Sequence, residues 1–388
     1  EVVLNGISYY GIDFINKMIG QFSFAYYSSE KRKLYLARDR LGQKPLFYYR
    51  DKNNIIFGSN LKSIAKNLNT VEVDKKSLSN YLNYGVVPSP DTIFKNIKKI
   101  EPASIVEFDP SAIFNDKKYH YWDISSYSNE KKFNSDEFLH LMDQAIEIRE
   151  EADVPIAYFL SGGIDSSSIV KNASDRGKEL NTFSVGHTER KYDESYWFKQ
   201  VIKKYKTNDF ISNINTKNIY DEIESSIGIF DEPYSDPSTL PSFIISREIS
   251  KKYKVAISGD GGDELLGGYK RIEKILNKNS YSSILSKLIN YYPGIFGTGN
   301  KLLSTSPDLK TAYTSFFSDK KLISMFNLED SYEFEDNFFK DMGSPYKSML
   351  VTDYLFYLSE MMMLKVDRTS MANSLEVRSP FVDHRLIE

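Results

Sequence analysis

A short run rich in serine and glycine has the residue types of a phosphate-binding loop. It has the sequence SGGIDSSS, residues 161–168, and follows an apolar stretch at 154–160 that predicts a buried strand. The two glycines permit a tight turn and a close approach to an anion. A helix predicted to begin near Asp165 would add free backbone N–H groups at its positive end. The sequence therefore predicts a cradle for phosphate oxygens, and the alternative is a serine-capped helix after a glycine turn.

This run differs from a Walker A loop, because it has no lysine for the terminal phosphates and carries Asp165 instead. An Asp inside a phosphate cradle makes chemical sense if Mg²⁺ bridges it to the nucleotide. Such a loop would hold the outer two phosphates of ATP as a leaving diphosphate while a nucleophile attacks the α-phosphorus. A carboxylate that attacks there becomes an acyl-adenylate.

A second acidic glycine-rich run, SGDGGDELLGGY at residues 258–269, follows another predicted strand at 255–257. Ligands in open α/β sheets bind beyond the carboxyl ends of the strands. Asp165 and Asp263 would come from two such strand ends, and they are therefore the candidate ligands of a magnesium ion. A turn or cap role is the alternative for Asp263.

Strands and helices alternate from residue 135 onward. Apolar runs at 154–160, 182–185, 210–211 and 255–257 predict strands, and helices are predicted at 135–151, from 165 to a stop at Gly177, from 193, and at 239–250. Trp197, Phe198 and Val201 are expected on the inward face of the helix from 193. The alternation predicts an α/β fold with a doubly wound parallel sheet. Residues 271–388 are predicted to be mostly helical.

The amino-terminal region has a different pattern. Short apolar-aromatic runs at 22–27, 33–37, 46–49 and 55–58 are separated by turn residues, which favours an antiparallel, hairpin-rich sheet. A polar stretch without periodicity at 119–134 indicates a linker.

Composition excludes several classes of function. The net charge of −3 over 388 residues gives no basic surface for nucleic acid, and we expect no nucleic-acid partner. The chain contains no Cys, and its four His are far apart, so neither a disulfide nor a zinc site is expected. No apolar run is long enough to cross a bilayer and no signal peptide is visible, which predicts a cytoplasmic protein without membrane contact.

Five motifs resemble the glutamine-hydrolysing asparagine synthetase family in their order along the chain. They are residues 161–168, 182–186 (TFSVG), 231–238 (DEPYSDPS), 258–269, and the paired segments 367–372 and 375–383. The resemblance implies a two-domain α/β protein. Residues 135–388 would form a doubly wound ATP-pyrophosphatase-type synthetase domain with a helical carboxyl-terminal part.

Upstream, FSFA at 22–25 and residues 36–46 resemble the second half of the family's glutaminase domain. This implies the remainder of an αββα sandwich of the N-terminal-nucleophile hydrolase type at 1–120, followed by a linker at 121–134. The family's nucleophile would be a Cys at the mature amino terminus. Because the chain has no Cys and starts at Glu1 without Met, we expect the nucleophile segment to be missing through truncation. A natural enzyme supplied only with free ammonia is the alternative.

The resemblance also implies roles for individual residues. Leu160 and Val185 would hold adenine through backbone groups, and their side chains suit a strand core equally well. The diphosphate cradle would consist of Ser161, Gly162, Gly163, Asp165, Ser166 and Ser167. Ser258 and Gly259 would lie against the ribose and the α-phosphate, and Asp165 and Asp263 would bind Mg²⁺.

Asp260 is the implied catalytic residue. It occupies the position at which well-known family members have a Glu that assists adenylate formation or attack by the amine, and its side chain is one methylene shorter. Because catalysis is sensitive to positioning on the ångström scale, the departure leaves a structural role open and puts the acceptor substrate in doubt. Arg368 and Arg378 could neutralise diphosphate or a substrate carboxylate, or form structural ion pairs. Arg38 and Arg40, with Asp39, are expected to hold the sheet or a domain interface.

The function implied is ATP-dependent asparagine synthesis from aspartate and glutamine-derived ammonia through β-aspartyl-AMP, with ATP and Mg²⁺ as cofactors. The alternatives are amidation of another carboxylate, such as a sugar acid or a peptide, a loop relative acting on tRNA or nucleotides, and a non-catalytic scaffold. The sequence leaves the oligomeric state open, with a homodimer as one state.

Overall fold

The computed structural model describes residues 1–111, 116–127, 133–187, 193–214, 219–277, 304, 306–326, 328 and 337–388. Within the chain, contacts define two compact units. Unit 1 comprises Glu1–Ser128, Asp231–Ser235 and Gly267–Met363, and unit 2 comprises Asn129–Phe230, Asp236–Leu266 and Leu364–Glu388. Unit 1 therefore contains residues from both predicted domains, and the predicted domain limits stay a prediction. Among the described residues, no helix has both the length and the hydropathy needed to span a bilayer.

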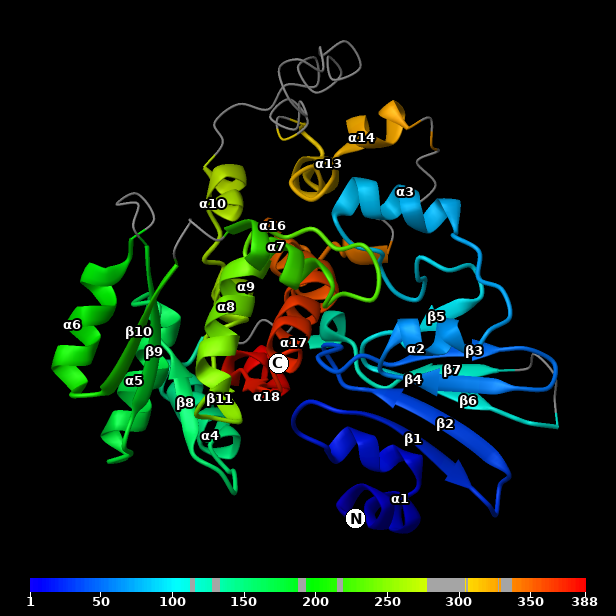
Figure 1. Ribbon diagram of the computed structural model, residues 1–388, viewed down its shortest axis with the longest axis horizontal. Helices are drawn as coiled ribbons and strands as arrows, with labels where there is room; N and C mark the ends of the chain where they lie inside the picture. Colours follow the sequence, from blue (N-terminus) through cyan, green and yellow to red (C-terminus); the bar gives the residue numbers. More distant parts are fainter. Residues whose placement is uncertain are drawn as a thin grey trace. The chain divides into compact units, whose positions relative to one another are not determined.

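Unit 2 is built on a five-stranded parallel sheet in the order β10-β9-β8-β11-β12 (Figure 1). Its strands are β8 (Ile156–Phe159), β9 (Asn181–His187), β10 (Asn208–Ile214), β11 (Val255–Ile257) and β12 (Glu376–Arg378). The first four confirm the predicted strands. The fifth lies in the region predicted to be mostly helical, and it has only three residues paired to β11 alone, so it leaves little local signal.

Helices cover both faces of this sheet, which confirms the parallel-sheet α/β prediction. On one face are α4 (Ser135–Arg149), α5 (Ile164–Asp175) and α6 (Ser195–Tyr205), and on the other α8 (Thr239–Ser250), with α7 (Ile219–Ile227) packed on it, and α17 (Met363–Met371). The alternation of strand side chains follows from the pleat, because Tyr158 joins the first core and Ala157 joins the second. Trp197 was predicted to face inward with Phe198 but is 61% exposed, whereas Phe198 is fully buried.

The strand order reverses between β8 and β11. The chain moves outward from β8 through β9 to β10, then returns to the other side of β8 for β11 and β12. The loops that follow β8 and β11 therefore leave two neighbouring strands at the carboxyl edge of the sheet, where such a reversal creates a crevice. The two predicted loops, residues 161–168 and 258–269, begin at this crevice. Short helices α9 (Gly262–Leu266), η7 (Pro380–Val382) and α18 (His384–Ile387) complete the described part of unit 2.

Unit 1 contains two antiparallel sheets between helices. One sheet has the order β1-β2-β6-β7 and the other β4-β3-β5. The strands are β1 (Ser23–Ser28), β2 (Lys33–Arg38), β3 (Phe47–Arg50), β4 (Ile55–Gly58), β5 (Ile97–Lys99), β6 (Ser104–Phe108) and β7 (Lys117–His120). One core, with Leu36, Phe108 and Tyr48, joins the sheets face to face. The antiparallel prediction is confirmed, although β7 occupies the start of the stretch at 119–134 that was predicted to be a linker.

Helices lie on the outer faces of these two sheets. The helix η1 (Ile12–Lys17) packs against β1, β2 and β6, and α2 (Leu61–Lys66) and α3 (Lys75–Tyr84) pack against β3 and β5. The layers thus follow the order helix, sheet, sheet, helix. Whether this is the fold of N-terminal-nucleophile hydrolases stays a prediction. The helix α1 (Val2–Tyr10) and the short η2 (Ile124–Tyr127) complete this part.

The rest of unit 1 is helical, as predicted for the carboxyl-terminal third. Its described helices are α10 (Lys270–Leu276), α13 (Leu309–Thr314), α14 (Lys320–Met325), α16 (Pro345–Thr352) and the π-helix η6 (Asp353–Met362). The Arg271 guanidinium pairs with the buried Asp353 at 2.9 Å and lies over the ring of Tyr269 at 3.8 Å. The helical prediction for 278–303, 305, 327 and 329–336 falls outside the described residues.

Candidate active site

The loop after β8 has the tight turn that its glycines predicted. Gly162 has a φ of +87°, and a Cβ at this position would lie 2.4 Å from the backbone nitrogen of Phe198 in α6. Any other residue would therefore strain the backbone and collide with a packed helix. The Ser161 Oγ accepts a hydrogen bond from the Gly163 N–H at 3.2 Å, which closes the turn directly before α5.

The start of α5 presents donors that its own chain does not use. No side chain caps this helix at its amino-terminal end. The Ser166 hydroxyl is engaged within the loop, since it contacts Ser161 Oγ at 3.1 Å and the Gly163 carbonyl at 3.3 Å. The Ser167 Oγ, in contrast, is buried and has no hydrogen-bond partner. A buried hydroxyl without a partner is costly, so its presence beside an uncapped helix start favours a ligand with oxygen acceptors.

The loops after β8 and β11 meet around Asp165. A Cβ on Gly262 would lie 2.5 Å from the Asp165 carboxyl carbon, and one on Gly259 would lie 3.1 Å from the backbone nitrogen of Ser166. Both glycines therefore allow the two loops to approach each other closely. The sequence had predicted a ligand contact for Gly259 and no role for Gly262. This contact brings the two predicted loops together at the reversal of the strand order.

Three carboxylates converge here. Burial, together with the negative charges of Asp263 and Asp260, raises the pKa of Asp165 to about 6. Asp165 is half-buried and Asp263 is exposed at the start of α9. Ionised carboxylates so close to one another repel, and a divalent cation would relieve that repulsion.

The acidic pair suits magnesium better than a transition metal. Within the described residues, no group of three or more His, Cys, Asp or Glu is arranged to hold a metal ion. Mg²⁺ in nucleotide sites is held by one or two carboxylates together with phosphate oxygens and water. Asp165 and Asp263 beside a phosphate cradle fit that donor set.

Asp260 is held at the end of β11. Its Oδ2 accepts a hydrogen bond from the Ser258 hydroxyl at 2.7 Å, and its carbonyl accepts one from the Ser379 hydroxyl. Ser258 is itself buried, and its backbone N–H donates to the Arg378 carbonyl at 3.0 Å. The Asp260 carboxylate is therefore oriented before any substrate arrives, as a group that acts in catalysis must be.

The predicted adenine-contact residues lie at the neighbouring strand ends. Leu160 is 1% exposed and donates its backbone N–H to the Phe183 carbonyl of β9 at 2.8 Å. The Leu160 side chain belongs to the hydrophobic core, which agrees with the prediction that it suits the core of a strand. Val185 is partly exposed in β9. Beside it, the buried Ser184 Oγ has no hydrogen-bond partner, and this residue was not among the predicted contacts.

Arg378, which the sequence left open, and Arg38 and Arg40, which were expected to be structural, all have structural partners. Arg378 donates to the Arg149 carbonyl at 3.0 Å and the Glu151 carbonyl at 2.8 Å, and it pairs with Glu376. Arg38 binds the carbonyls of Gly42, Lys44 and Ile100, and Arg40 binds those of Asn16 and Met18. Arg38 and Arg40 therefore have a structural role within unit 1, as the sequence predicted.

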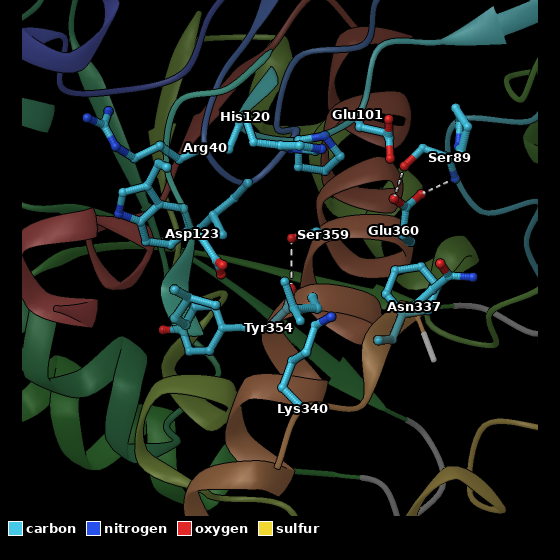
Figure 2. A pocket seen from close by; sticks show the side chains of 18 of the residues that line it. Arg40, Ser89, Glu101, His120, Asp123, Asn337, Lys340, Tyr354, Ser359 and Glu360 are labelled. Atoms are coloured by element: carbon cyan, nitrogen blue, oxygen red, sulfur yellow. Dashed lines mark hydrogen bonds between the residues drawn. The ribbon is translucent and has the colours of Figure 1, made fainter. Parts of the chain in front are cut away.

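Unit 1 contains a separate cavity of about 620 Å³ (Figure 2). Figure 2 shows Glu360 of η6 at its wall, where its carboxylate accepts hydrogen bonds from the Ser89 backbone and hydroxyl. Two other acids of the wall are already paired, Asp91 with Lys98 and Glu101 with Lys118. No predicted site residue lines this cavity, so the candidate chemistry stays in unit 2.

Two family models match this chain in comparisons with known proteins. The glutamine amidotransferase domain model matches residues 1–122, and the asparagine synthase model matches residues 137–388. A solved glutamine-dependent NAD⁺ synthetase from Acinetobacter baumannii in complex with ADP has a TM-score of 0.27 and 13% identity, over 84% of this chain and 82% of its own. That likeness is too weak to support a conclusion about this chain.

Two curated relatives cover the sequence more closely. The "Asparagine synthetase [glutamine-hydrolyzing] 1" of Bacillus subtilis is 29% identical over 99% of this chain and 63% of its own length. The "Putative asparagine synthetase [glutamine-hydrolyzing] 2" of Methanocaldococcus jannaschii is 37% identical over 69% of this chain and 53% of its own length. The chain thus spans between half and two thirds of these relatives. Since the synthase model accounts for more than half of its residues, this chain belongs to the asparagine synthase family.

Proposed function

We propose that the intact gene product containing this chain activates a carboxylate by adenylation and then converts it to an amide with ammonia taken from glutamine. The observation that carries the proposal is the meeting of the 161–168 loop with the acidic 258–263 loop at the reversal of the strand order. Within that reaction class, we propose aspartate as the acceptor, β-aspartyl-AMP as the intermediate and asparagine as the product.

In the first step, an oxygen of the acceptor carboxylate forms a bond to the α-phosphorus of ATP. The bond from that phosphorus to the diphosphate breaks, and its electron pair leaves with the diphosphate. Donors at the start of α5, with the unpartnered Ser167 hydroxyl, would stabilise the negative charge that grows there, and Ser161 and Ser166 would hold the loop in shape. Bound Mg²⁺, held by Asp165 and Asp263, would neutralise phosphate charge.

In the second step, ammonia adds to the activated carbonyl and AMP leaves. The nitrogen must lose a proton as the amide forms. Asp260, oriented by Ser258 and Ser379, is the proposed group that helps position the attacking amine or accept this proton. In the intact protein, the part that matches the glutamine amidotransferase domain would supply ammonia from glutamine.

Acceptor-dependent exchange of labelled diphosphate into ATP tests the proposal. The intact gene product, given ATP and Mg²⁺, should exchange label when aspartate is present and give only background exchange without it. Asparagine should then accumulate once glutamine or ammonia is added. No exchange with any carboxylic acid, in a protein that still binds ATP, would contradict the adenylation step.

A second acceptor is favoured by one feature of the site. Asp260 is shorter than the Glu of better-known family members, which changes the geometry next to the activated carbonyl. Exchange that depends on a sugar acid or a peptide carboxylate, with none for aspartate, would assign the protein to that alternative and keep the same chemistry.

A further inference from the structure

Lys365 is a buried cation near the start of α17 in unit 2. It is only 4% exposed, and its Nζ donates a hydrogen bond to the Ser238 Oγ at 2.9 Å. Ser238 is fixed in turn by Asp236, whose carboxylate accepts from the Ser238 backbone N–H at 2.7 Å and from its hydroxyl. The ammonium group is therefore held in one place, which is uncommon for a flexible lysine.

The fold brings this group to the carboxyl edge of the parallel sheet. Because α8 packs on the sheet and leads directly into the parallel strand β11, it runs antiparallel to that strand, and its first residue Thr239 lies at the carboxyl edge. The helix α17 leads into β12, so its start lies at the same edge. The phosphate-cradle loop and the acidic loop also begin there.

A second observation points to a ligand at this position. The Thr239 Oγ1, next to Ser238, is buried and has no hydrogen-bond partner. Among the described residues, the buried serine and threonine hydroxyls without a partner are those of Ser167, Ser184 and Thr239. Ser167 and Ser184 flank the candidate nucleotide site, and Thr239 opens the helix beside Lys365. Thr239 and Ser167 each belong to the first turn of a helix at the same sheet edge.

We propose that Lys365 and Thr239 bind an oxyanion of the ligation reaction, while Ser238 holds the Lys365 ammonium group in place. The proposal rests on the proposed function. The anion is either the departing diphosphate or a carboxylate of the acyl acceptor, since both are planar or tetrahedral sets of anionic oxygens that an ammonium and a hydroxyl can bind. The resemblance to the asparagine synthetase family implies no role for Lys365 or Thr239.

Kinetics of the exchange reaction with the variant Lys365→Met test the proposal. If the anion is diphosphate, its KM should rise about tenfold to a hundredfold, the size of a lost hydrogen bond to a charged group, while the KM of the acceptor stays unchanged. If the anion is the acceptor carboxylate, the KM of the acceptor should rise by that factor instead. Lys365→Arg, which keeps the charge, should restore part of the affinity.

Two further variants separate binding from folding. Lys171→Met removes an exposed lysine of α5 that pairs with Asp175, and both KM values should stay at the wild-type level. Thr239→Val keeps the shape of the side chain and removes only its hydroxyl, and it should raise the same KM about threefold to tenfold. This variant keeps the test valid if Lys365→Met does not fold.

The outcomes distinguish this inference from the proposed function. Wild-type exchange together with unchanged KM values in folded Lys365→Met would overturn the role of Lys365 and leave adenylation intact. If Lys365→Met does not fold, unchanged KM values in Thr239→Val would overturn it. A wild-type protein without exchange would overturn the proposed function itself.

Discussion

Two loops of this protein each contain an Asp and a glycine with positive φ, but the two Asp carboxylates have opposite surroundings. They are the loop after β2, residues 39–45, and the loop after β8, residues 161–168, and each follows a largely buried strand. In the first loop, the fully buried Asp39 accepts backbone N–H groups from Phe22, Leu41, Gln43 and Lys44, at 2.9 to 3.3 Å.

In the second loop, no described residue donates a hydrogen bond to the Asp165 carboxylate, and the negative charges of Asp263 and Asp260 raise its pKa. The Ser167 hydroxyl beside it has no partner either. The first loop thus satisfies its buried Asp and stabilises a sheet, whereas the second leaves the Asp165 carboxylate and the Ser167 hydroxyl available for an external ligand. The partners of the Asp, more than the presence of Asp and Gly, distinguish a structural loop from a binding loop.

The largest expected effect is that of Asp165→Asn. We expect the exchange reaction to fall by about a thousandfold or more, because a ligand of the cation and its charge are both lost. The variant should be as stable as the wild type or more stable at neutral pH, since it removes a carboxylate that its neighbours disfavour. Exchange rates and thermal unfolding measure these two changes.

The matched control for that variant is Asp175→Asn, on the exposed last turn of the same helix, where the carboxylate pairs with Lys171. It should leave both exchange and stability close to wild type. If Asp165→Asn instead unfolded at a clearly lower temperature than the wild type, Asp165 would have a structural role like that of Asp39. The two loops would then not differ in the way described.

Asp39→Asn should have the reverse pattern. An amide has one acceptor oxygen for four N–H donors, and the free energy of unfolding should fall by about 3 kcal/mol or more. Asp51→Asn is the control, because Asp51 also accepts two backbone N–H groups at 2.7 Å but lies in an exposed turn, so the loss should be about 1 kcal/mol. Urea unfolding of both variants would contradict the account if the two losses were equal.

The pH dependence of nucleotide binding sharpens the comparison further. The folded-state pKa of Asp165, about 6, lies above its ordinary value of 3.8, so the stability gained from the protonated form is full below 3.8 and is lost as the pH rises through 6. Cation binding needs the ionised form. We therefore expect the affinity for Mg²⁺–ATP to weaken by up to about tenfold for each pH unit below 6.

Calorimetric titration at several pH values measures this dependence, with Asp165→Asn as the control that should not show it. An affinity in the wild type that stays constant between pH 7 and about pH 5 would contradict the assignment of Asp165 as a ligand.

The smallest expected effect concerns a single hydroxyl. Ser167→Ala should raise the KM for ATP about threefold to tenfold, since it removes a donor that no protein group uses. Ser168→Ala is the matched control, because its hydroxyl already bonds the Asp165 carbonyl at 2.7 Å within the helix. Equal KM values for the two variants would show that the free hydroxyl is not turned toward the nucleotide.

Much of the architecture could be predicted from local patterns. The strands at 154–160 and 255–257 are short apolar runs bounded by turn residues, and the structure confirms both. The strand β12 could not be predicted in the same way, because three residues held by one neighbour carry almost no periodicity. The inward position expected for Trp197 was wrong, since a short amphipathic pattern fixes the buried face of a helix only to within about one residue.

The site was predictable as residue types but not as contacts. Serines and glycines after a strand indicated the cradle, and the order of the strands explains why the two acidic loops meet. The steric demand on Gly262, the unpartnered Ser184 and Thr239, and the buried Lys365 depend on residues far apart in the sequence. Such contacts have no local signal, so the sequence alone could not predict them.

The most direct test of the central claim is to identify what becomes of ATP. Phosphorus NMR of the intact gene product turning over ATP with its acceptor and ammonia should show AMP and diphosphate in equal amounts, because the cradle at residues 161–168 is proposed to retain the outer two phosphates as one unit. The appearance of ADP and orthophosphate instead would contradict this account of the loop.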